Sequence, residues 1–132
     1  MILVDTNVLL DVVTDDSKWL KWSLTQLDVG ALNETLAINA VIYAELSVRF
    51  DRIERVEIFL ASVGITMLSI PRSALFLAGK AFKRYRLAGG PRHGVLPDFF
   101  IGAHAAVAGL TLLTRDAQRY RTYFPTIHLV TP

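Results

Sequence analysis

Four acidic side chains occupy positions from which they could act together on one substrate. Asp5 and Asp116 each follow a short apolar run, whereas Glu45 and Asp98 lie in stretches with helical character. A carboxylate that is removed from water is costly unless a cation or several hydrogen-bond donors compensate for the lost hydration. The chemistry open to these four residues therefore depends on whether the fold brings them to one place.

If the four carboxylates converge, a divalent cation would hold them together. Without one they would repel each other, and some would take up a proton. Mg²⁺ and Mn²⁺ prefer oxygen ligands, whereas the absence of cysteine and the presence of only three histidines disfavour zinc. Such an ion acidifies a bound water and stabilises the leaving oxygen of a phosphodiester. The residues thus point to metal-dependent phosphodiester hydrolysis.

The elements that must position these residues alternate between strands and helices. Short apolar runs rich in β-branched residues predict strands at 2–4, 36–38, 65–70, 111–114 and 127–130. Helical spacing, with Gly and Pro as end signals, predicts helices at 8–13, 17–29, 40–49, 52–63, 73–87 and 99–108 and a short one through Tyr120. This alternation is typical of an α/β fold in which helices cover both faces of a mainly parallel sheet.

A parallel sheet would bring the four acids to one edge. Right-handed crossovers place the carboxyl ends of all strands at the same edge, where open α/β sheets bind their ligands. Asp5 and Asp116 would lie at that edge, and Glu45 and Asp98 would lie in helices that start near it. Two of the acids also have an ordinary structural interpretation: Asp98 as the N-cap of the helix at 99–108, and Glu45 as an exposed helical residue.

A run of basic residues precedes Asp98 in the chain. It begins in the helix at 73–87, continues into the following loop, and comprises Lys80, Lys83, Arg84, Arg86, Arg92 and His93. Two interpretations stay open for this run: a solvated basic face, or a surface that contacts the phosphates of a nucleic acid. The net charge of +2 would favour a polyanionic partner only if four of the twelve acids gather in one site.

Two other features also have both a structural and a functional interpretation. Trp19 and Trp22 stand three residues apart, which suits a core-facing helix surface or an anchor for a protein partner. His104 lies in the middle of a helix among alanines. A packed or exposed histidine is more common there than a metal ligand.

The composition indicates one folded domain over residues 1–132. The chain is 52% hydrophobic and contains no cysteine, which is compatible with a reducing compartment. The longest apolar run, at 99–113, is too short to cross a bilayer and is interrupted by His104. The first residues carry no cationic leader. We therefore expect a cytoplasmic protein without a membrane segment.

The motifs, taken in order, resemble those of the PIN domain family, and within it the VapC-type ribonuclease toxins of toxin–antitoxin pairs. The resemblance rests on Asp5-Thr6-Asn7 after an N-terminal apolar strand, Glu45-Leu46 in an early helix, Pro97-Asp98-x-x-Ile101-x-Ala103, and Leu113-Thr114-x-Asp116. These motifs span nearly the whole chain. The resemblance implies a three-layer α/β/α sandwich and an Mg²⁺- or Mn²⁺-dependent endoribonuclease. It also implies a homodimer and a cognate antitoxin that blocks the site, with a higher-order toxin–antitoxin complex as a further option.

The resemblance also assigns roles to individual residues. Asp5, Glu45, Asp98 and Asp116 would form an acidic quartet, in which Asp5 and Asp98 bind the metal directly. Glu45 and Asp116 would bind it through water or hold a second ion. Thr6, Asn7 and Thr114 would support the carboxylates through hydrogen bonds. Asn39 departs from the pattern, because many relatives have Ser or Thr at that position.

Other functions compete with this assignment. A non-catalytic PIN-like module would keep the fold and act through an antitoxin-like partner in a DNA-binding complex. A receiver-like phosphoacceptor is disfavoured because Thr6 and Asn7, rather than a second acid, follow Asp5, and because no lysine follows Lys83. A haloacid-type phosphatase would need an acid where Asn7 stands.

Overall fold

The computed structural model describes residues 1–92 and 95–132 and contains a five-stranded sheet. The strands are β1 (Ile2–Val4), β2 (Leu36–Asn39), β3 (Ile65–Leu68), β4 (Thr111–Leu113) and β5 (Leu129–Val130). They lie in the order β3-β2-β1-β4-β5, and every neighbouring pair is parallel. The expected α/β fold with a parallel sheet is therefore confirmed. His93 of the basic run lies outside the described residues.

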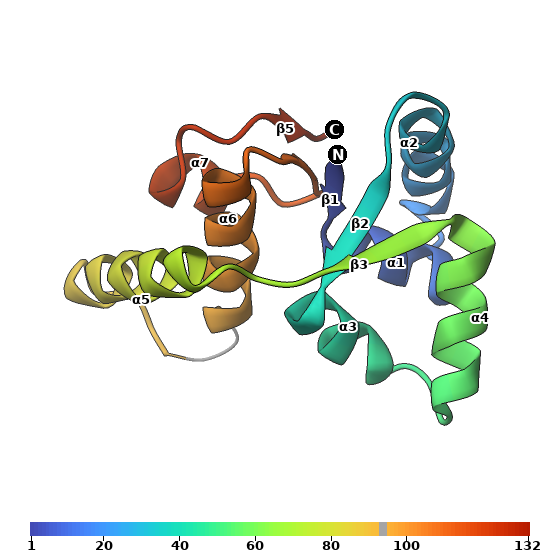
Figure 1. Ribbon diagram of the computed structural model, residues 1–132, viewed down its shortest axis with the longest axis horizontal. Helices are drawn as coiled ribbons and strands as arrows, with labels where there is room; N and C mark the ends of the chain where they lie inside the picture. Colours follow the sequence, from blue (N-terminus) through green and yellow to red (C-terminus); the bar gives the residue numbers. More distant parts are fainter. Residues whose placement is uncertain (93–94) are drawn as a thin grey trace.

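The described residues also form helices that cover the sheet on both sides. These are α1 (Thr6–Val13), α2 (Leu20–Asn33), α3 (Ala40–Ser47), α4 (Ile53–Val63), α5 (Arg72–Leu87), α6 (Leu96–Ala108) and α7 (Gln118–Tyr123). In Figure 1, α1, α2 and α4 lie on one side of the sheet, and α5, α6 and α7 lie on the other. This is the expected three-layer α/β/α sandwich. No helix in the described ranges is long and apolar enough to cross a membrane.

The central strands carry the core. All residues of β1 and β2 are buried, as are Leu112 and Leu113 of β4. A strand covered by helices on both faces must be apolar along its whole length, which explains why these strands read as short continuous hydrophobic runs. The polar residues Asp5, Asn39 and Thr114 stand at the carboxyl ends of these three strands and are nevertheless buried. The fold thus places buried polar groups at the carboxyl edge of the sheet.

Helix α2 differs from the sequence prediction at its C-terminus. The expected end at Gly30 is wrong, because the helix continues to Asn33. A Cβ atom at Gly30 would lie only 3.0 Å from the side chain of Leu36 and 3.2 Å from that of Ile2. This glycine therefore permits the close approach of α2 to the sheet instead of ending the helix.

Helix α6 begins earlier than its sequence pattern suggested, which changes the role of Asp98. Its N-cap is Val95, Pro97 stands in the first turn, and Asp98 follows within that turn. The prediction that Asp98 caps this helix is therefore wrong. Proline is favoured in the first turn because that turn does not need its missing N–H group. Pro97 was thus the signal for an earlier start.

Candidate active site

The carboxyl ends of β1 and β4 bring Asp5 and Thr114 side by side. Val4 is paired with Leu113 in the sheet register, and the amide of Asp5 donates to the carbonyl of Leu113 at 2.9 Å. Asp5 then caps α1, because its carboxylate accepts from the amide of Thr6 at 2.7 Å. Strand pairing and helix capping together fix this carboxylate in place.

Asp5 is a buried carboxylate with several hydrogen-bond donors around it. Its exposed fraction is only 4%. Oδ2 accepts from the hydroxyl of Thr114 at 2.8 Å and from the hydroxyl of Tyr120 at 2.9 Å. The side-chain nitrogen Nδ2 of Asn7 lies farther away, at 3.5 Å from the same oxygen. The backbone amide of Thr6 and the hydroxyls of Thr114 and Tyr120 therefore hold the carboxylate of Asp5.

The hydrogen bonds do not fully compensate for the burial of Asp5. Burial, and secondarily the charge of Asp98, raise the pKa of Asp5 from 3.8 to about 6, although Thr114, Tyr120 and Thr6 act in the opposite direction. Ionisation of Asp5 is therefore less favourable than that of an ordinary aspartate. A nearby cation would stabilise it, since an opposite charge favours the charged form.

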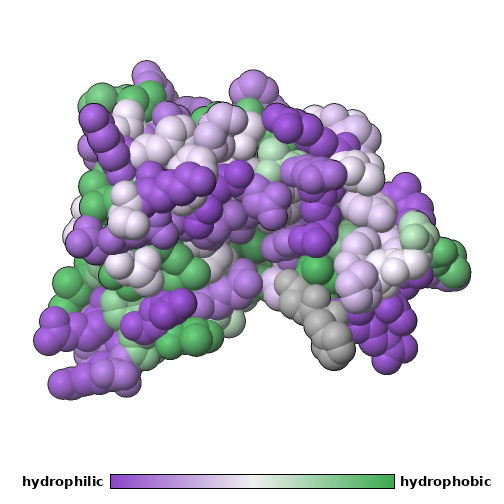
Figure 2. Space-filling view, turned by 180° about the vertical axis from the view of Figure 1, so that it is seen from behind, coloured by the Kyte–Doolittle hydropathy of each residue, from purple (hydrophilic) through white to green (hydrophobic). Residues whose placement is uncertain are grey.

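Three of the four predicted acids line one hollow. It has a volume of about 390 Å³, opens between α1, α3 and the start of α6, and is lined by Asp5, Thr6, Asn7, Leu10, Glu45, Val48, Arg49 and Asp98. We call it the acidic hollow. Glu45 accepts from the hydroxyl of Thr6 at 2.7 Å, so this carboxylate is oriented as well. Figure 2 shows from behind that the molecule is notched between the side formed by α3 and α4 and the side formed by α5.

Asp98 faces two opposing influences. Arg119 of α7 donates to Oδ2 of Asp98 and forms an ion pair with it, and both groups are about one quarter exposed. Burial raises the pKa of Asp98, Arg119 lowers it, and the charges of Glu45 and Asp116 raise it again, so that the pKa lies above its usual value. The charges of Glu45 and Asp116 thus act on Asp98, although Asp116 does not line the acidic hollow.

Asp116 stands apart from the other three acids. It is exposed and lines a neighbouring hollow together with Arg119. Its amide donates to the hydroxyl of Thr114 at 3.1 Å, which ties its loop to the end of β4. In the described part of the chain, no three acidic or histidine side chains are close enough to form a ready-made metal site. The oxygen ligands nevertheless fit a hard cation, because the carboxylates of Asp5, Glu45 and Asp98 line one hollow and repel each other without one.

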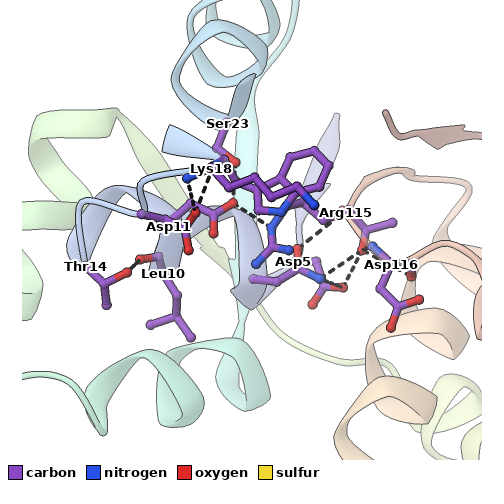
Figure 3. A network of polar contacts seen from close by, with 12 residues as sticks. Asp5, Leu10, Asp11, Thr14, Lys18, Ser23, Arg115 and Asp116 are labelled. Atoms are coloured by element: carbon purple, nitrogen blue, oxygen red, sulfur yellow. Dashed lines mark hydrogen bonds and ion pairs between the residues drawn. The ribbon is translucent and has the colours of Figure 1, made fainter. Parts of the chain in front are cut away.

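A polar network fixes the loop that carries Thr114 and Asp116 (Figure 3). Arg115 donates from Nε to the buried carboxylate of Asp11 at 2.7 Å, and the hydroxyl of Ser23 donates to the same oxygen at 2.6 Å. The amide of Arg115 donates to the side chain of Asn7 at 3.2 Å. The guanidinium also lies 5.2 Å from the ring of Trp19. The loop is therefore anchored to α1 and α2.

Trp19 contacts this anchor, and Trp22 packs against Trp19. Both rings are half-buried, and they meet edge to face with 6.1 Å between their centroids. The guanidinium of Arg115 lies over the ring of Trp19 and forms a cation–π contact with it. The structural interpretation of this pair is therefore supported.

His104 and Asn39 form a buried pair that is separate from the acids. The side chain of Asn39 accepts from the amide of Ile42 at 3.0 Å and caps α3, and its amide group lies 3.1 Å from Nδ1 of His104. Asn39 thus does the capping that a Ser or Thr would do at this position. His104 is buried, which is one of the two outcomes, packed or exposed, that were expected for it.

The basic run of α5 does not line the acidic hollow. Lys80, Lys83, Arg84 and Arg86 are exposed on α5, and Arg92 is exposed after it. The guanidinium of Arg86 donates a hydrogen bond to the carbonyl of Gly90 at 2.7 Å. Among the residues that the structure describes, Arg49 of the turn after α3 is the basic residue in the lining of the hollow.

Sequence reasoning missed Tyr120, Arg119, Arg49 and the pair formed by Arg115 and Asp11. Tyr120 and Arg119 come from a short helix late in the chain and reach Asp5 and Asp98 across more than twenty residues of sequence. No local pattern marks such a contact. A signal was available only for Arg115. It stands between Thr114 and Asp116, and a residue between two site residues must itself be held in place.

Comparisons with known proteins agree with the fold. A search of curated proteins finds no match. Among solved structures, the chain is similar to VapBC2 from Rickettsia felis bound to a promoter DNA fragment (TM-score 0.75, 20% identity, covering 100% of this chain and 99% of that one). It is also similar to DNA-bound VapBC from Salmonella typhimurium (TM-score 0.69, 18% identity, 98% and 96% covered) and to a toxin–antitoxin complex from Klebsiella pneumoniae (TM-score 0.69, 22% identity, 100% and 98% covered). The model of the PIN domain matches residues 2–125, so this chain belongs to the PIN domain family.

Proposed function

We propose that this protein is a metal-dependent endoribonuclease that acts as the toxin of a type II toxin–antitoxin pair. The observation that carries the proposal is the buried Asp5, whose pKa is raised to about 6 and which lines one hollow with Glu45 and Asp98. Perturbed acids in a hollow are typical of functional sites. PIN domains are generally nucleases, and the similar structures named above are toxin–antitoxin complexes.

Mg²⁺ or Mn²⁺ is the cation that suits these residues. Asp5 and Asp98 would hold it directly, and Glu45 and Asp116 would act through water or with a second ion. When bound, the ion would activate a water and stabilise the oxygen that leaves the phosphodiester. Thr114 and Tyr120 hold Asp5, and Thr6 holds Glu45, so the ligand carboxylates are oriented in advance. Arg119, freed from Asp98 by the cation, would supply a positive charge for the scissile phosphate.

The direct test is RNA cleavage by the purified protein. We expect cleavage of single-stranded RNA with Mg²⁺ or Mn²⁺ and none with EDTA. Asp5→Ala and Asp98→Asn should lower the rate at least 100-fold, whereas Asp28→Asn, which changes an exposed acid on α2, should cleave like the wild type. Full cleavage by Asp98→Asn would remove that residue from the site.

A second candidate function is a non-catalytic scaffold in a DNA-binding complex. It is favoured by the DNA present in the similar structures from Rickettsia felis and Salmonella typhimurium. Expression in a bacterial host separates the two functions. Growth arrest that Asp5→Ala relieves supports the toxin, whereas an unaltered effect of Asp5→Ala supports the scaffold.

The partners belong to the same proposal. A cognate antitoxin would block the acidic hollow, and the toxin would form a homodimer and join a larger complex with the antitoxin. Light scattering of the purified protein measures the homodimer. Co-expression with the product of an adjacent small reading frame, followed by co-purification and loss of cleavage, tests the antitoxin.

A further inference from the structure

A second hollow lies beside the acidic hollow. It has a volume of about 420 Å³, opens between α5 and α7, and is lined by Tyr85, Asp116, Gln118, Arg119, Thr122 and Tyr123. We call it the tyrosine hollow. The two hollows meet at an ion pair, since Asp98 lines the first and its partner Arg119 lines the second. A ligand in the tyrosine hollow would therefore lie next to the proposed cleavage site.

The aromatic wall of the tyrosine hollow is fixed in place. The rings of Tyr85 and Tyr123 meet edge to face with 5.9 Å between their centroids, and each lies 5.3 Å from the buried ring of Phe99. Both tyrosines are half-buried, so part of each ring remains accessible. A rigid, partly exposed aromatic surface is what unstacked bases of single-stranded RNA bind.

The polar wall suits the remainder of a nucleotide. Arg119 is about one quarter exposed, and its guanidinium lies 5.7 Å from the ring of Tyr85. Gln118 and Thr122 are exposed on the same helix and can exchange hydrogen bonds with a ribose or a base edge. The volume falls within the range of about 300–1,000 Å³ that is usual for ligand pockets.

We infer that the tyrosine hollow binds the nucleoside next to the scissile phosphate, with its base against Tyr85 and Tyr123 and its phosphate beside Arg119. This inference rests on the proposed ribonuclease function. It assigns base recognition to Tyr85 of α5 and Tyr123 of α7, and not to the exposed basic residues along α5. The hollow therefore contributes to the choice of cleavage position.

The test uses a short single-stranded RNA that the wild type cleaves at one position, with one base removed at each position in turn. Loss of the base adjacent to the cleavage site should raise KM roughly tenfold for the wild type, because that base no longer stacks. Tyr123→Leu should raise KM to a similar degree with the intact RNA, and the missing base should then have no further effect. Such non-additivity would show that the base and the ring act on each other.

A second variant tests the inference independently, in case Tyr123→Leu does not fold. Thr122→Glu places a negative charge in the tyrosine hollow at an exposed position, where it should repel the phosphate and raise KM. Thr25→Glu is its matched control, because Thr25 is also an exposed helical threonine whose hydroxyl donates to the carbonyl four residues earlier. Thr25→Glu should cleave like the wild type.

The remaining outcomes distinguish this inference from the proposed function. If the wild type cleaves RNA but base removal and Thr122→Glu leave KM unchanged, the inference is wrong and the ribonuclease function stands. The same holds if these variants weaken only antitoxin binding, which would assign the hollow to a protein partner. If the wild type cleaves no RNA, both proposals fall.

Discussion

Arg115 and Asp11 form an ion pair of 2.7 Å that joins the loop after β4 to α1. Asp11 is only 2% exposed and Arg115 is 27% exposed, so the pair is shielded from water more than the surface pair of Arg52 and Glu54, in which both side chains are over 60% exposed. The loop that Arg115 anchors carries Thr114 and Asp116. The pair is therefore a positioning device for two residues of the proposed site.

Replacing Arg115 with Met should destabilise the protein. Among the described residues, the buried Asp11 would keep Ser23 as its one side-chain donor. An uncompensated charge costs about 3–5 kcal/mol when it is fully buried. We expect roughly 2 kcal/mol by urea denaturation, because Arg115 is partly exposed. Arg52→Met should change the free energy of unfolding by less than about 0.5 kcal/mol. Equal effects of both variants would contradict a role for this pair.

Tyr120→Phe should weaken the support of Asp5. Burial and the charge of Asp5 raise the pKa of Tyr120 well above 10, so its hydroxyl stays protonated and donates. Without this donor the pKa of Asp5 should rise further above 6, which carboxyl NMR titration can measure. Tyr43→Phe removes a hydroxyl that donates to the exposed Glu57 at 2.9 Å and should leave Asp5 unchanged. An unchanged Asp5 titration in Tyr120→Phe would contradict this role.

The stability of the metal-free protein should fall as the pH rises from 4 to 7. The pKa of Asp5 is about 6 in the folded protein and 3.8 ordinarily, so in this interval the folded state binds more protons than the unfolded state. The resulting stabilisation is complete below pH 4 and is lost as the pH rises through 6; its size is roughly 3 kcal/mol. Urea denaturation in EDTA at several pH values measures it. Asp5→Asn should flatten this dependence, and a slope equal to that of the wild type would assign it to other groups.

The sequence predicted the fold well because the fold depends on local signals. Apolar runs ended by Asp5 or by Thr114 mark strand ends, and parallel topology then gathers those ends without further information. The same reasoning placed all four acids at one edge, and the structure brings Asp5, Glu45 and Asp98 into one hollow, whereas Asp116 lines the neighbouring one. The start of α6 was misplaced because Asp98 is a strong capping residue, and its preference outweighed the weaker signal of Pro97.

The contacts to Asp5 and Asp98 from α7 could not be predicted in the same way. Tyr120 and Arg119 act through side chains whose partners are set by how α7 packs on α6. That packing depends on Gly102, where a Cβ atom would lie 2.4 Å from the ring of Phe124 and 3.1 Å from that of Tyr120. The sequence shows a glycine in a helix, but it does not show which aromatic ring packs into the space that a Cβ atom would otherwise fill.

Gly102→Ala should therefore disturb the site from a distance. The added methyl group would displace Phe124 and Tyr120, and overpacking of this kind costs about 1–3 kcal/mol. Gly79→Ala is a matched control on α5, because a Cβ there meets nothing within 4 Å, and alanine should stabilise the helix by roughly 0.5–1 kcal/mol. Opposite signs of the two changes in thermal denaturation are expected. Gly102→Ala should also cleave RNA more slowly, whereas a stable and fully active variant would separate α7 from the site.

The salt dependence of RNA binding can distinguish the contribution of the basic face of α5 from that of Arg49, which lines the acidic hollow. Arg49 lines the hollow, whereas Lys83 and Arg84 are exposed on α5 and do not line it. If all three contact phosphates, each charge removed should reduce the slope of log affinity against log salt by roughly 0.7 for single-stranded RNA. We expect this loss for Arg49→Gln, measured by fluorescence anisotropy with a labelled oligonucleotide. The double variant Lys83→Gln and Arg84→Gln decides between the two interpretations of the basic run: a slope reduced by about 1.4 assigns it to RNA, and an unchanged slope makes it a solvated face.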